Sequence, residues 1–431
     1  MVKKGVFTAV VCFLLSFAMT AQDVSFGGKC SFGTAYLHLD DLTAASYSLP
    51  ENTLVSNGLV QLLMTVSAGN AVRAYFGGSV SNYALTDISG NDAVLLQQNV
   101  SLDKAYLKLR LPWFSGQRMR LSMGKMPLSW GYGTVFNAGD IVFGPEPESF
   151  KNSGAFFSGV SESSLSDLRT STDWMVNASV PLVAGALTVE PLAVLPLESG
   201  TDAAVSEESS LYSLLSGSTS PLSGKTACPR AGGRIMFTPW LEQLETVEAG
   251  YLTGLAGAEQ QFYAAADGNL YADYNLCASF SLFRDDLSFT GSSGAVKKYT
   301  PAEQTEESAA VSFGLSKMYT VTNSDTGQSH TLSLRAESLV YPFTGNGKVF
   351  AFGSFSFTQV LSSSVTYLFT RTLPDSLAGQ AAFVQENIHL LALNLGITPL
   401  SPLTFNITAV LPDLQHAAEI QELSFSCTYR F

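Results

Sequence analysis

The chain ends in the stretch Leu423-Ser424-Phe425-Ser426-Cys427-Thr428-Tyr429-Arg430-Phe431, in which apolar and polar side chains alternate at every position. Because successive side chains of a β-strand point to opposite faces, this period of two puts the apolar side chains on one face and the polar ones on the other. A strand of this kind separates lipid on one side from water on the other. We therefore predict an amphipathic strand over 421–431.

The same alternation recurs along the chain from Val24 onwards. In 403–411, for example, Phe405 and Ile407 are separated by the polar residue Asn406. Each such segment has about the ten residues that a tilted strand needs to cross a membrane. We predict eighteen strands, over 24–39, 54–67, 70–83, 99–111, 117–126, 173–182, 186–197, 232–240, 244–256, 260–267, 270–283, 309–322, 328–342, 348–359, 362–372, 387–397, 403–411 and 421–431.

The connections between these strands alternate in length. After the second strand, every other connection is a turn of a few residues. Most of the intervening connections are long and rich in Ser, Pro and acidic residues, although 257–259 and 343–347 are short exceptions. Outer-membrane barrels have short periplasmic turns and long outer loops. We therefore expect the loops at 198–231 and 284–308 on the outside of the cell.

The composition favours a membrane barrel over a soluble protein. Only 14% of the residues are charged while 46% are hydrophobic, and soluble domains carry about 25% charged residues. After the first 21 positions there is no apolar run of the roughly 20 residues that a membrane helix needs. We predict an all-β fold, a closed antiparallel transmembrane β-barrel of about 16–18 strands with 14–20 as the outer range. The net charge of −13 argues against nucleic acid as a partner.

The first 21 residues have the pattern of a secretory signal peptide. Lys3 and Lys4 give a positive start, the segment 5–19 is apolar, and the small residues Thr20 and Ala21 precede the expected cleavage site. A membrane anchor is the alternative interpretation. We expect residues 22–431 to form one barrel domain, within which 127–172 is either a loop folded into the barrel or an extra hairpin.

The final strand also resembles that of bacterial outer-membrane proteins, which ends in an aromatic residue read by the barrel-insertion machinery. Phe425, Tyr429 and Phe431 carry this resemblance. It implies that the chain is exported through the periplasm to the outer membrane. Its partners would then be outer-membrane lipid, the insertion machinery and periplasmic chaperones. An ordinary edge strand is the alternative.

One predicted hairpin concentrates positive charge. Between Lys104 and Lys125 there is no acidic residue, and the period of two puts most of its cations on the face opposite the apolar side chains. Since a charge facing lipid at the membrane midplane costs about 2–4 kcal/mol, these cations are expected to line the lumen. The candidates are Lys104, Lys108, Arg110, Arg118 and Arg120. Lys125 falls on the outward face and is expected near the membrane interface.

Two interpretations of these cations remain open. They form a basic ladder that draws anions through a pore, or they are neutralised by acidic residues from other strands of the lumen wall. The candidate acids for such pairing are Glu190, Asp273 and Glu337.

The segment that follows, from Gly124 to Asp140, resembles stretches of some bacterial outer-membrane porins. In those, a strand ending in Gly-Lys or Gly-Arg leads into Trp-Gly and then Asn-x-x-Asp. The resemblance implies that 127–172 folds into the barrel and narrows it, and its aromatic content also favours packing against a wall. The candidate constriction residues are Trp130, Tyr132, Phe136, Asn137 and Asp140.

These features favour a porin for the passive diffusion of small hydrophilic solutes, leaning toward anions. The alternatives are a barrel for a hydrophobic ligand, similar to fatty-acid transporters, and a surface protein whose loops bind other molecules. The four histidines are scattered and the cysteines lack metal-site spacing, so we expect no enzymatic activity, no cofactor and no metal. Cys30 and Cys427 lie on the first and last strands, where apolar packing is favoured over a disulfide.

Overall fold

The computed structural model describes residues 23–39, 52–88, 93–147, 169, 171–183, 185–195, 229–254, 259–283, 289–290, 296–297, 309–322, 329–343, 345–358, 360–371, 387–411 and 420–431. The predicted signal peptide at 1–21 and most of the predicted outer loops at 198–231 and 284–308 lie outside these residues. Among the described residues, no helix is long and apolar enough to cross a membrane.

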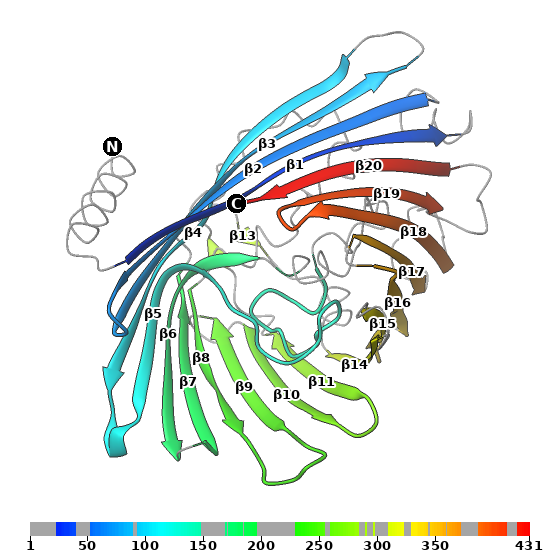
Figure 1. Cartoon of the computed structure of the whole chain (residues 1–431). Helices are drawn as coiled ribbons and strands as arrows, with labels where there is room; N and C mark the ends of the chain where they lie inside the picture. The colour runs from blue at the N-terminus through cyan, green and yellow to red at the C-terminus, as the bar shows by residue number, and fades with distance from the viewer. Residues whose placement is uncertain are drawn as a thin grey trace.

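Eighteen antiparallel strands form one sheet, in which each strand pairs with the neighbours before and after it along the chain (Figure 1). The last strand, β20 (Ile420–Arg430), also pairs with the first, β1 (Asp23–Leu39), from Lys29 opposite Arg430 to Leu39 opposite Ile420. The sheet therefore closes on itself and leaves no unpaired edge, as a strand structure in lipid requires. The predicted closed antiparallel β-barrel is confirmed.

Each of the eighteen predicted segments overlaps one strand of the barrel, and the largest shift at a strand start is that of β4, which begins at Ala93 instead of residue 99. The separate pair β12 (Phe289–Thr290) and β13 (Val296–Lys297) forms its own two-stranded sheet. The barrel strands between β1 and β20 are β2 (Asn52–Ala68), β3 (Val72–Asp87), β4 (Ala93–Pro112), β5 (Arg118–Pro127), β6 (Thr172–Val183), β7 (Leu187–Val194), β8 (Arg230–Phe237), β9 (Thr246–Gly254), β10 (Glu259–Asn269), β11 (Asp273–Phe283), β14 (Ala309–Thr322), β15 (Ser329–Tyr341), β16 (Asn346–Ser356), β17 (Leu361–Arg371), β18 (Asn387–Leu400) and β19 (Leu403–Leu411).

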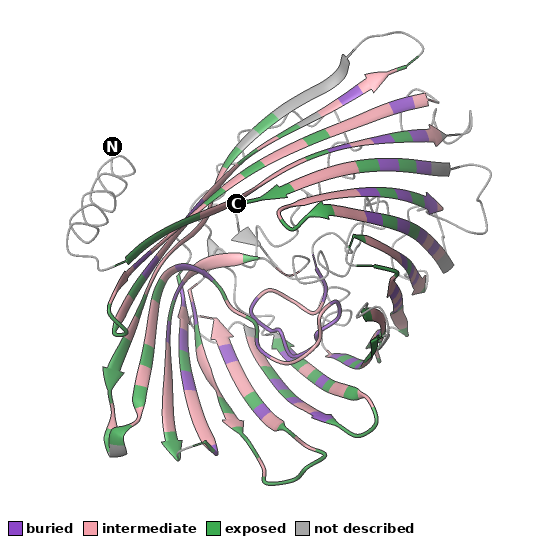
Figure 2. Ribbon diagram, in the orientation of Figure 1, coloured by how far each residue is buried: buried purple, intermediate pink, exposed green. Residues whose placement is uncertain are grey.

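The two faces of the barrel wall are inverted relative to a soluble protein. On β17, Ser364 and Thr366 are buried, whereas Val365 between them is 46% exposed. On β20, Ser424 is buried while Leu423 is 55% exposed, and the same banding runs along the other strands (Figure 2). Polar side chains thus face the lumen and apolar side chains face outward, which is the arrangement that a surrounding lipid phase stabilises.

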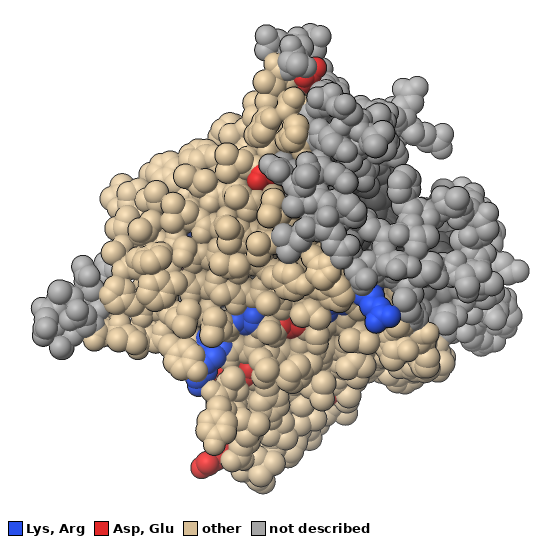
Figure 3. All heavy atoms as spheres, turned by 90° about the vertical axis from the view of Figure 1, so that its right-hand side faces the viewer, with Lys and Arg blue, Asp and Glu red and all other residues tan. Residues whose placement is uncertain are grey.

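Large aromatic side chains are exposed at the short turns. Phe114 lies in the β4–β5 turn, Trp240 in the β8–β9 turn and Tyr271 in the β10–β11 turn, and all three are highly exposed. Aromatic residues of membrane barrels gather where the apolar band meets the headgroups. Charged side chains occupy only a few places on the described part of the surface in Figure 3.

The barrel closes at the seam between β1 and β20. The backbone of Phe431 exchanges two hydrogen bonds with that of Gly28, at 2.8 and 3.0 Å. Cys30 faces Tyr429 across the seam and Cys427 faces Phe32, and both thiols are free. The cysteines therefore lie on adjacent strands, as the sequence predicts, but in different register positions.

Candidate functional site

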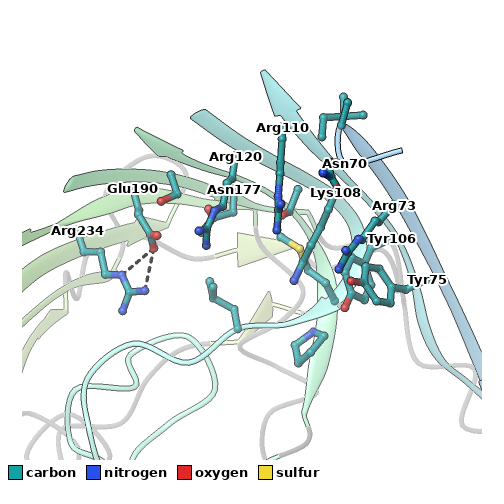
Figure 4. A pocket seen from close by; sticks show the side chains of 17 residues that line it. Asn70, Arg73, Tyr75, Tyr106, Lys108, Arg110, Arg120, Asn177, Glu190 and Arg234 are labelled. Carbon is teal, nitrogen blue, oxygen red and sulfur yellow. Dashed lines mark hydrogen bonds and ion pairs between the residues drawn. The ribbon is translucent and has the colours of Figure 1, made fainter. Parts of the chain in front are cut away.

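A group of cations lines the lumen side of β3, β4 and β5. The strand register places Arg73 opposite Lys108, and Arg110 opposite Arg120. The side chains border a cavity of about 380 Å³ inside the barrel (Figure 4). Of the described residues that line it, five are cationic and Glu190 alone is acidic. We call these strands and their lumen side chains the basic wall.

Most of the predicted pore-lining residues lie at this site. Lys108, Arg110 and Arg120 border the first cavity. Arg118 borders a second cavity of about 340 Å³ together with Arg110 and Arg120, next to the β4–β5 and β6–β7 turns. Lys104 lines neither of them, and the register of β4 shifts beside it, between the pairs Gly77–Lys104 and Gly78–Leu102.

Part of this site was not predicted from the sequence. Arg73 is the single cation of β3, whereas the predicted lumen residues came from a hairpin that holds several cations. Tyr75 and Tyr106 stack with ring centroids 4.7 Å apart, and the Lys108 ammonium lies 5.4 Å from each centroid. The two rings stabilise the cation beside them without neutralising it. The alternation of side chains along β3 and β4 could have indicated these residues, because it puts them on the lumen side of their strands together with the residues that they face.

The candidate acids are engaged elsewhere. Glu190 accepts a hydrogen bond from Arg234 at 2.8 Å, Asp273 accepts one from Asn269, and Glu337 binds backbone amides of the loop described below. Among the described residues, no acidic side chain lies within ion-pair distance of Lys108, Arg110, Arg118 or Arg120. Lys125, expected near the membrane interface, is instead buried, with Ala105 and Trp174 as its register partners.

The loop after β5 runs inside the barrel. Residues 128–147 lie in the lumen against the strands from β8 to β16 (Figure 1). The predicted constriction residues Trp130, Phe136, Asn137 and Asp140 are all at most 2% exposed, and Tyr132 is partly buried. The side chains of Trp130 and Phe136 pack in one apolar cluster with residues of the barrel wall, so the loop occupies space that would otherwise belong to the lumen.

Side chains of the barrel wall hold the backbone of this loop. Gly131 N–H donates to Glu248 on β9, Tyr132 N–H to the Cys277 Sγ on β11 at 3.2 Å, and Ala138 N–H to Ser312 on β14 at 2.9 Å. Three further amides donate to Glu337 on β15. Arg230 on β8 donates to the carbonyls of residues 141 and 142. Backbone groups away from water need such partners.

The loop also depends on internal contacts. Asn137 donates to the Trp130 carbonyl at 2.9 Å and accepts from the Gly139 amide at 3.0 Å. Gly133 has φ of 130°, and a Cβ there would lie 2.1 Å from the Phe136 carbonyl oxygen, so only glycine fits. The two hydrogen bonds of Asn137 fix the conformation of the loop, and its side chain is buried away from the lumen.

Asp140 forms an ion pair with Arg169 and accepts a hydrogen bond from the Phe143 amide at 3.1 Å. Burial raises the pKa of the Asp140 carboxyl, and the guanidinium of Arg169 acts in the opposite direction. Both contacts lie within the loop and its continuation. Asp140 is therefore a structural residue of the loop, and its carboxylate is not presented to a solute.

The loop and the basic wall meet at Arg234. This residue on β8 bridges Glu190 and Glu248, both at 2.8–2.9 Å, and lies 5.9 Å from the ring of Trp130. It also borders the basic cavity together with Leu128 at the start of the loop. One network therefore joins the loop to the cavity. The sequence does not show this network, because the register that places Glu190 opposite Arg234 and the packing of the Trp130 ring beside Arg234 are set only in the folded barrel.

No protein-family model and no curated protein sequence matches the chain. Among solved structures it is similar to OccAB1 of Acinetobacter baumannii, with 8% identity, a TM-score of 0.49, and coverage of 96% of this chain and 97% of that one. It is similar to Pseudomonas putida OprB at high pH, with 11% identity, a TM-score of 0.44 and coverage of 97% and 96%. It is also similar to Pseudomonas aeruginosa OccK2 in complex with glucuronate, with 11% identity, a TM-score of 0.45 and coverage of 96% and 97%.

The closed-barrel architecture of this chain is shown by its own strand pairing, which joins eighteen antiparallel strands among the described residues. The described residues hold no group of three or more His, Cys, Asp or Glu side chains placed to bind a metal. The described site offers fixed charges, aromatic faces and hydrogen-bonding groups around a lumen.

Proposed function

We propose that the chain is an outer-membrane channel through which small hydrophilic solutes diffuse passively, with a preference for anions. The observation that carries the proposal is the lumen itself. A closed barrel with an apolar outer face encloses a cavity bordered by Arg73, Lys108, Arg110 and Arg120. Barrels of this strand number are wide enough for water, and a lumen wall that bears fixed cations attracts anions.

The anion preference follows from the distribution of charge. The chain as a whole is acidic, with a net charge of −13. Salt at physiological strength screens charges beyond about 8 Å in water, so distant acidic residues act weakly on an ion inside the lumen. The cations of the basic wall border the cavity directly. They therefore outweigh the net charge in setting which ion enters.

The same proposal includes the route to the membrane. Residues 1–21 serve as a cleaved signal peptide, and Phe425, Tyr429 and Phe431 serve as the signal for the insertion machinery after periplasmic chaperones deliver the chain. In support, all three aromatic residues are exposed on the outward face of β20 and its end. The channel performs no covalent chemistry and needs no cofactor.

Two other functions make different predictions. A protein whose outer loops bind other molecules would insert into a bilayer without conducting. A barrel for a hydrophobic ligand would need an apolar binding site in the lumen, whereas the cavity described here is bordered mainly by charged and polar side chains. This observation favours the channel.

The test is to refold the full chain, confirm its heat-modifiable migration, and add it to a planar lipid bilayer. We expect stepwise conductance, and a zero-current potential in a potassium chloride gradient whose sign reports chloride preference. Folded protein that produces no conductance steps would refute the channel. Conductance with cation preference would retain the channel and refute its charge selectivity.

A further inference from the structure

Glu190 lies between two cations of the cavity of about 380 Å³, which we call the basic cavity. On one side it faces Arg234 of β8 in the strand register. On the other side, β6 separates it from β5, where Arg120 faces Ser179 of β6. Figure 4 shows the three charged side chains in this order along the cavity wall. Of the described residues that line the cavity, Glu190 is the one that carries a negative charge.

Glu190 and a second carboxylate together neutralise Arg234. The Oε2 of Glu190 accepts a hydrogen bond from the Arg234 Nε at 2.8 Å and lies 2.8 Å from the Arg234 Nη2. The Nη1 of Arg234 donates to Glu248 at 2.9 Å and to the Ser129 carbonyl at 3.4 Å. All three nitrogen atoms of this guanidinium are therefore engaged by oxygen atoms of the protein.

The other cations of the basic cavity have no such partners. Among the described residues, none of them forms an ion pair with an acidic side chain. The aromatic rings beside Lys108 leave its charge in place. These cations are Arg73, Lys108, Arg110 and Arg120. An anion in the cavity therefore meets four unpaired positive charges and, next to them, one carboxylate.

The position of this carboxylate matters for the release of an anion. Adjacent strands lie about 4.8 Å apart, so the backbones of Glu190 and Arg120 are separated by about 10 Å. Charges at such a separation interact appreciably, because the effective dielectric constant near a protein surface is about 20. A channel conducts only where an ion binds firmly enough to enter and loosely enough to leave. The negative charge of Glu190 repels an anion bound to its neighbours and so shortens its stay.

We infer that Glu190 is a specificity-determining residue, which weakens the binding of anions to the basic cavity and so lets them pass through it. The inference rests on the proposed channel function. Replacing the carboxylate by an amide removes the repulsion, and it leaves Arg234 with Glu248 as its one ionic partner among the described residues. Both changes add positive potential to the cavity, so anions bind more tightly without the charge of Glu190.

The first test measures anion binding without conduction. Sulfate is titrated into the refolded full chain in detergent, and calorimetry gives its dissociation constant. Glu190→Gln keeps the size of the side chain and one acceptor oxygen for Arg234, and we expect it to bind sulfate about fivefold more tightly than the unmodified chain. Glu190→Asp keeps the charge and should retain the weak binding of the unmodified chain.

The matched control is Glu242→Gln in the β8–β9 turn. Glu242 is exposed and does not line the basic cavity, so this variant changes the net charge by the same amount outside the cavity. Its sulfate binding should equal that of the unmodified chain. An equal gain in Glu242→Gln and Glu190→Gln would overturn the inference, because net charge and not position would then set the affinity. Unchanged or absent sulfate binding in folded Glu190→Gln would overturn it as well.

The second test measures conduction. In planar bilayers, the sulfate concentration that halves the chloride current should be about fivefold lower for Glu190→Gln. Its zero-current potential in a potassium chloride gradient should shift further toward chloride preference. Glu190→Gln channels that bind sulfate more tightly in detergent but are blocked at the original concentration would overturn the role of Glu190 in permeation. An unmodified chain that folds without conducting would refute the channel, and calorimetry would still decide whether Glu190 weakens anion binding.

Discussion

Two stretches of the barrel wall share one outer surface and differ inside. On β17 to β20, apolar residues such as Val365 and Ile407 face outward and small polar residues such as Ser364 and Thr408 face the lumen. On the basic wall the outward residues are also apolar, with Met123 among the exposed ones, but the lumen side carries cations. Lipid imposes one chemistry on every outward position, whereas the lumen leaves each strand free to differ. Under the proposed channel function, the residues that act on the solute therefore lie only at the inward positions.

The two lumen surfaces also differ in how their polar groups are satisfied. On the wall from β17 to β20, Thr408 donates to Asn394 at 2.9 Å and Asn394 donates to Ser364 at 3.5 Å, so polar side chains of neighbouring strands bind one another, whereas the carboxylate of Glu422 on β20 has no hydrogen-bond partner among the described residues. On the basic wall, Lys108 and Arg110 have no acidic partner within ion-pair distance among the described residues. Under the proposed channel function, the basic wall is the part of the lumen that acts on a passing ion by its charge.

We call the wall from β17 to β20, whose lumen side carries mostly uncharged polar side chains, the neutral wall. The largest expected effect concerns the seam between β1 and β20, where this wall meets the first strand. Deleting Phe431 removes both backbone hydrogen bonds to Gly28 and an exposed aromatic side chain at the end of the last strand. We expect a several-fold loss of heat-modifiable barrel in the outer membrane and protease-sensitive chain in the periplasm. Phe431→Tyr keeps the backbone bonds and an aromatic ring, and is the control. Normal assembly of the deletion would contradict the assignment of Phe431 as an insertion signal.

A second experiment separates the two faces of the neutral wall. Ile407 is exposed to the outside, and Ser426 lies on the lumen side opposite Asn406, the residue before Ile407. We expect Ile407→Lys to lower the free energy of unfolding by about 2–4 kcal/mol, because it places a charge against lipid near the middle of a strand. Ser426→Lys should cost clearly less, since its ammonium enters the water of the lumen. Equal losses in urea unfolding from lipid vesicles would mean that the two positions do not face different phases.

The smallest expected effect is on ion selectivity. Replacing Lys108, Arg110, Arg118 and Arg120 together with Gln removes four cations that border the two cavities. The zero-current potential in a salt gradient should shift toward cation preference. Ser426→Lys adds a cation to the neutral wall and should shift it in the opposite direction by a smaller amount. If the potential stays in place in the fourfold variant, the cations are already neutralised inside the barrel.

Local alternation explains why the strands could be predicted closely. In 403–411, the apolar or polar character of each residue indicates on which face of the strand it lies. The predicted bounds of this segment match those of β19. The lumen direction of Lys108, Arg110 and Arg120 follows from the same rule, and the structure places all three around the cavity. Lys125 departs from the expectation of an interfacial cation because it is buried against neighbours that the sequence does not identify.

At most strand positions, with Lys125 as an exception, the sequence by itself determined which residues face lipid and which face water, because lipid acts on every outward side chain independently of its neighbours. It did not determine which charges meet. That Arg234 binds both Glu190 and Glu248 was decided by the register of three consecutive strands, β7, β8 and β9. That Glu337 binds three amides of the inward loop was decided only when segments about two hundred residues apart were brought together in the closed barrel. These contacts depend on the register of many strand pairs at once, and a shift of one residue in any strand reverses its faces. The tertiary structure therefore decided the loop's position, and with it the shape of the lumen.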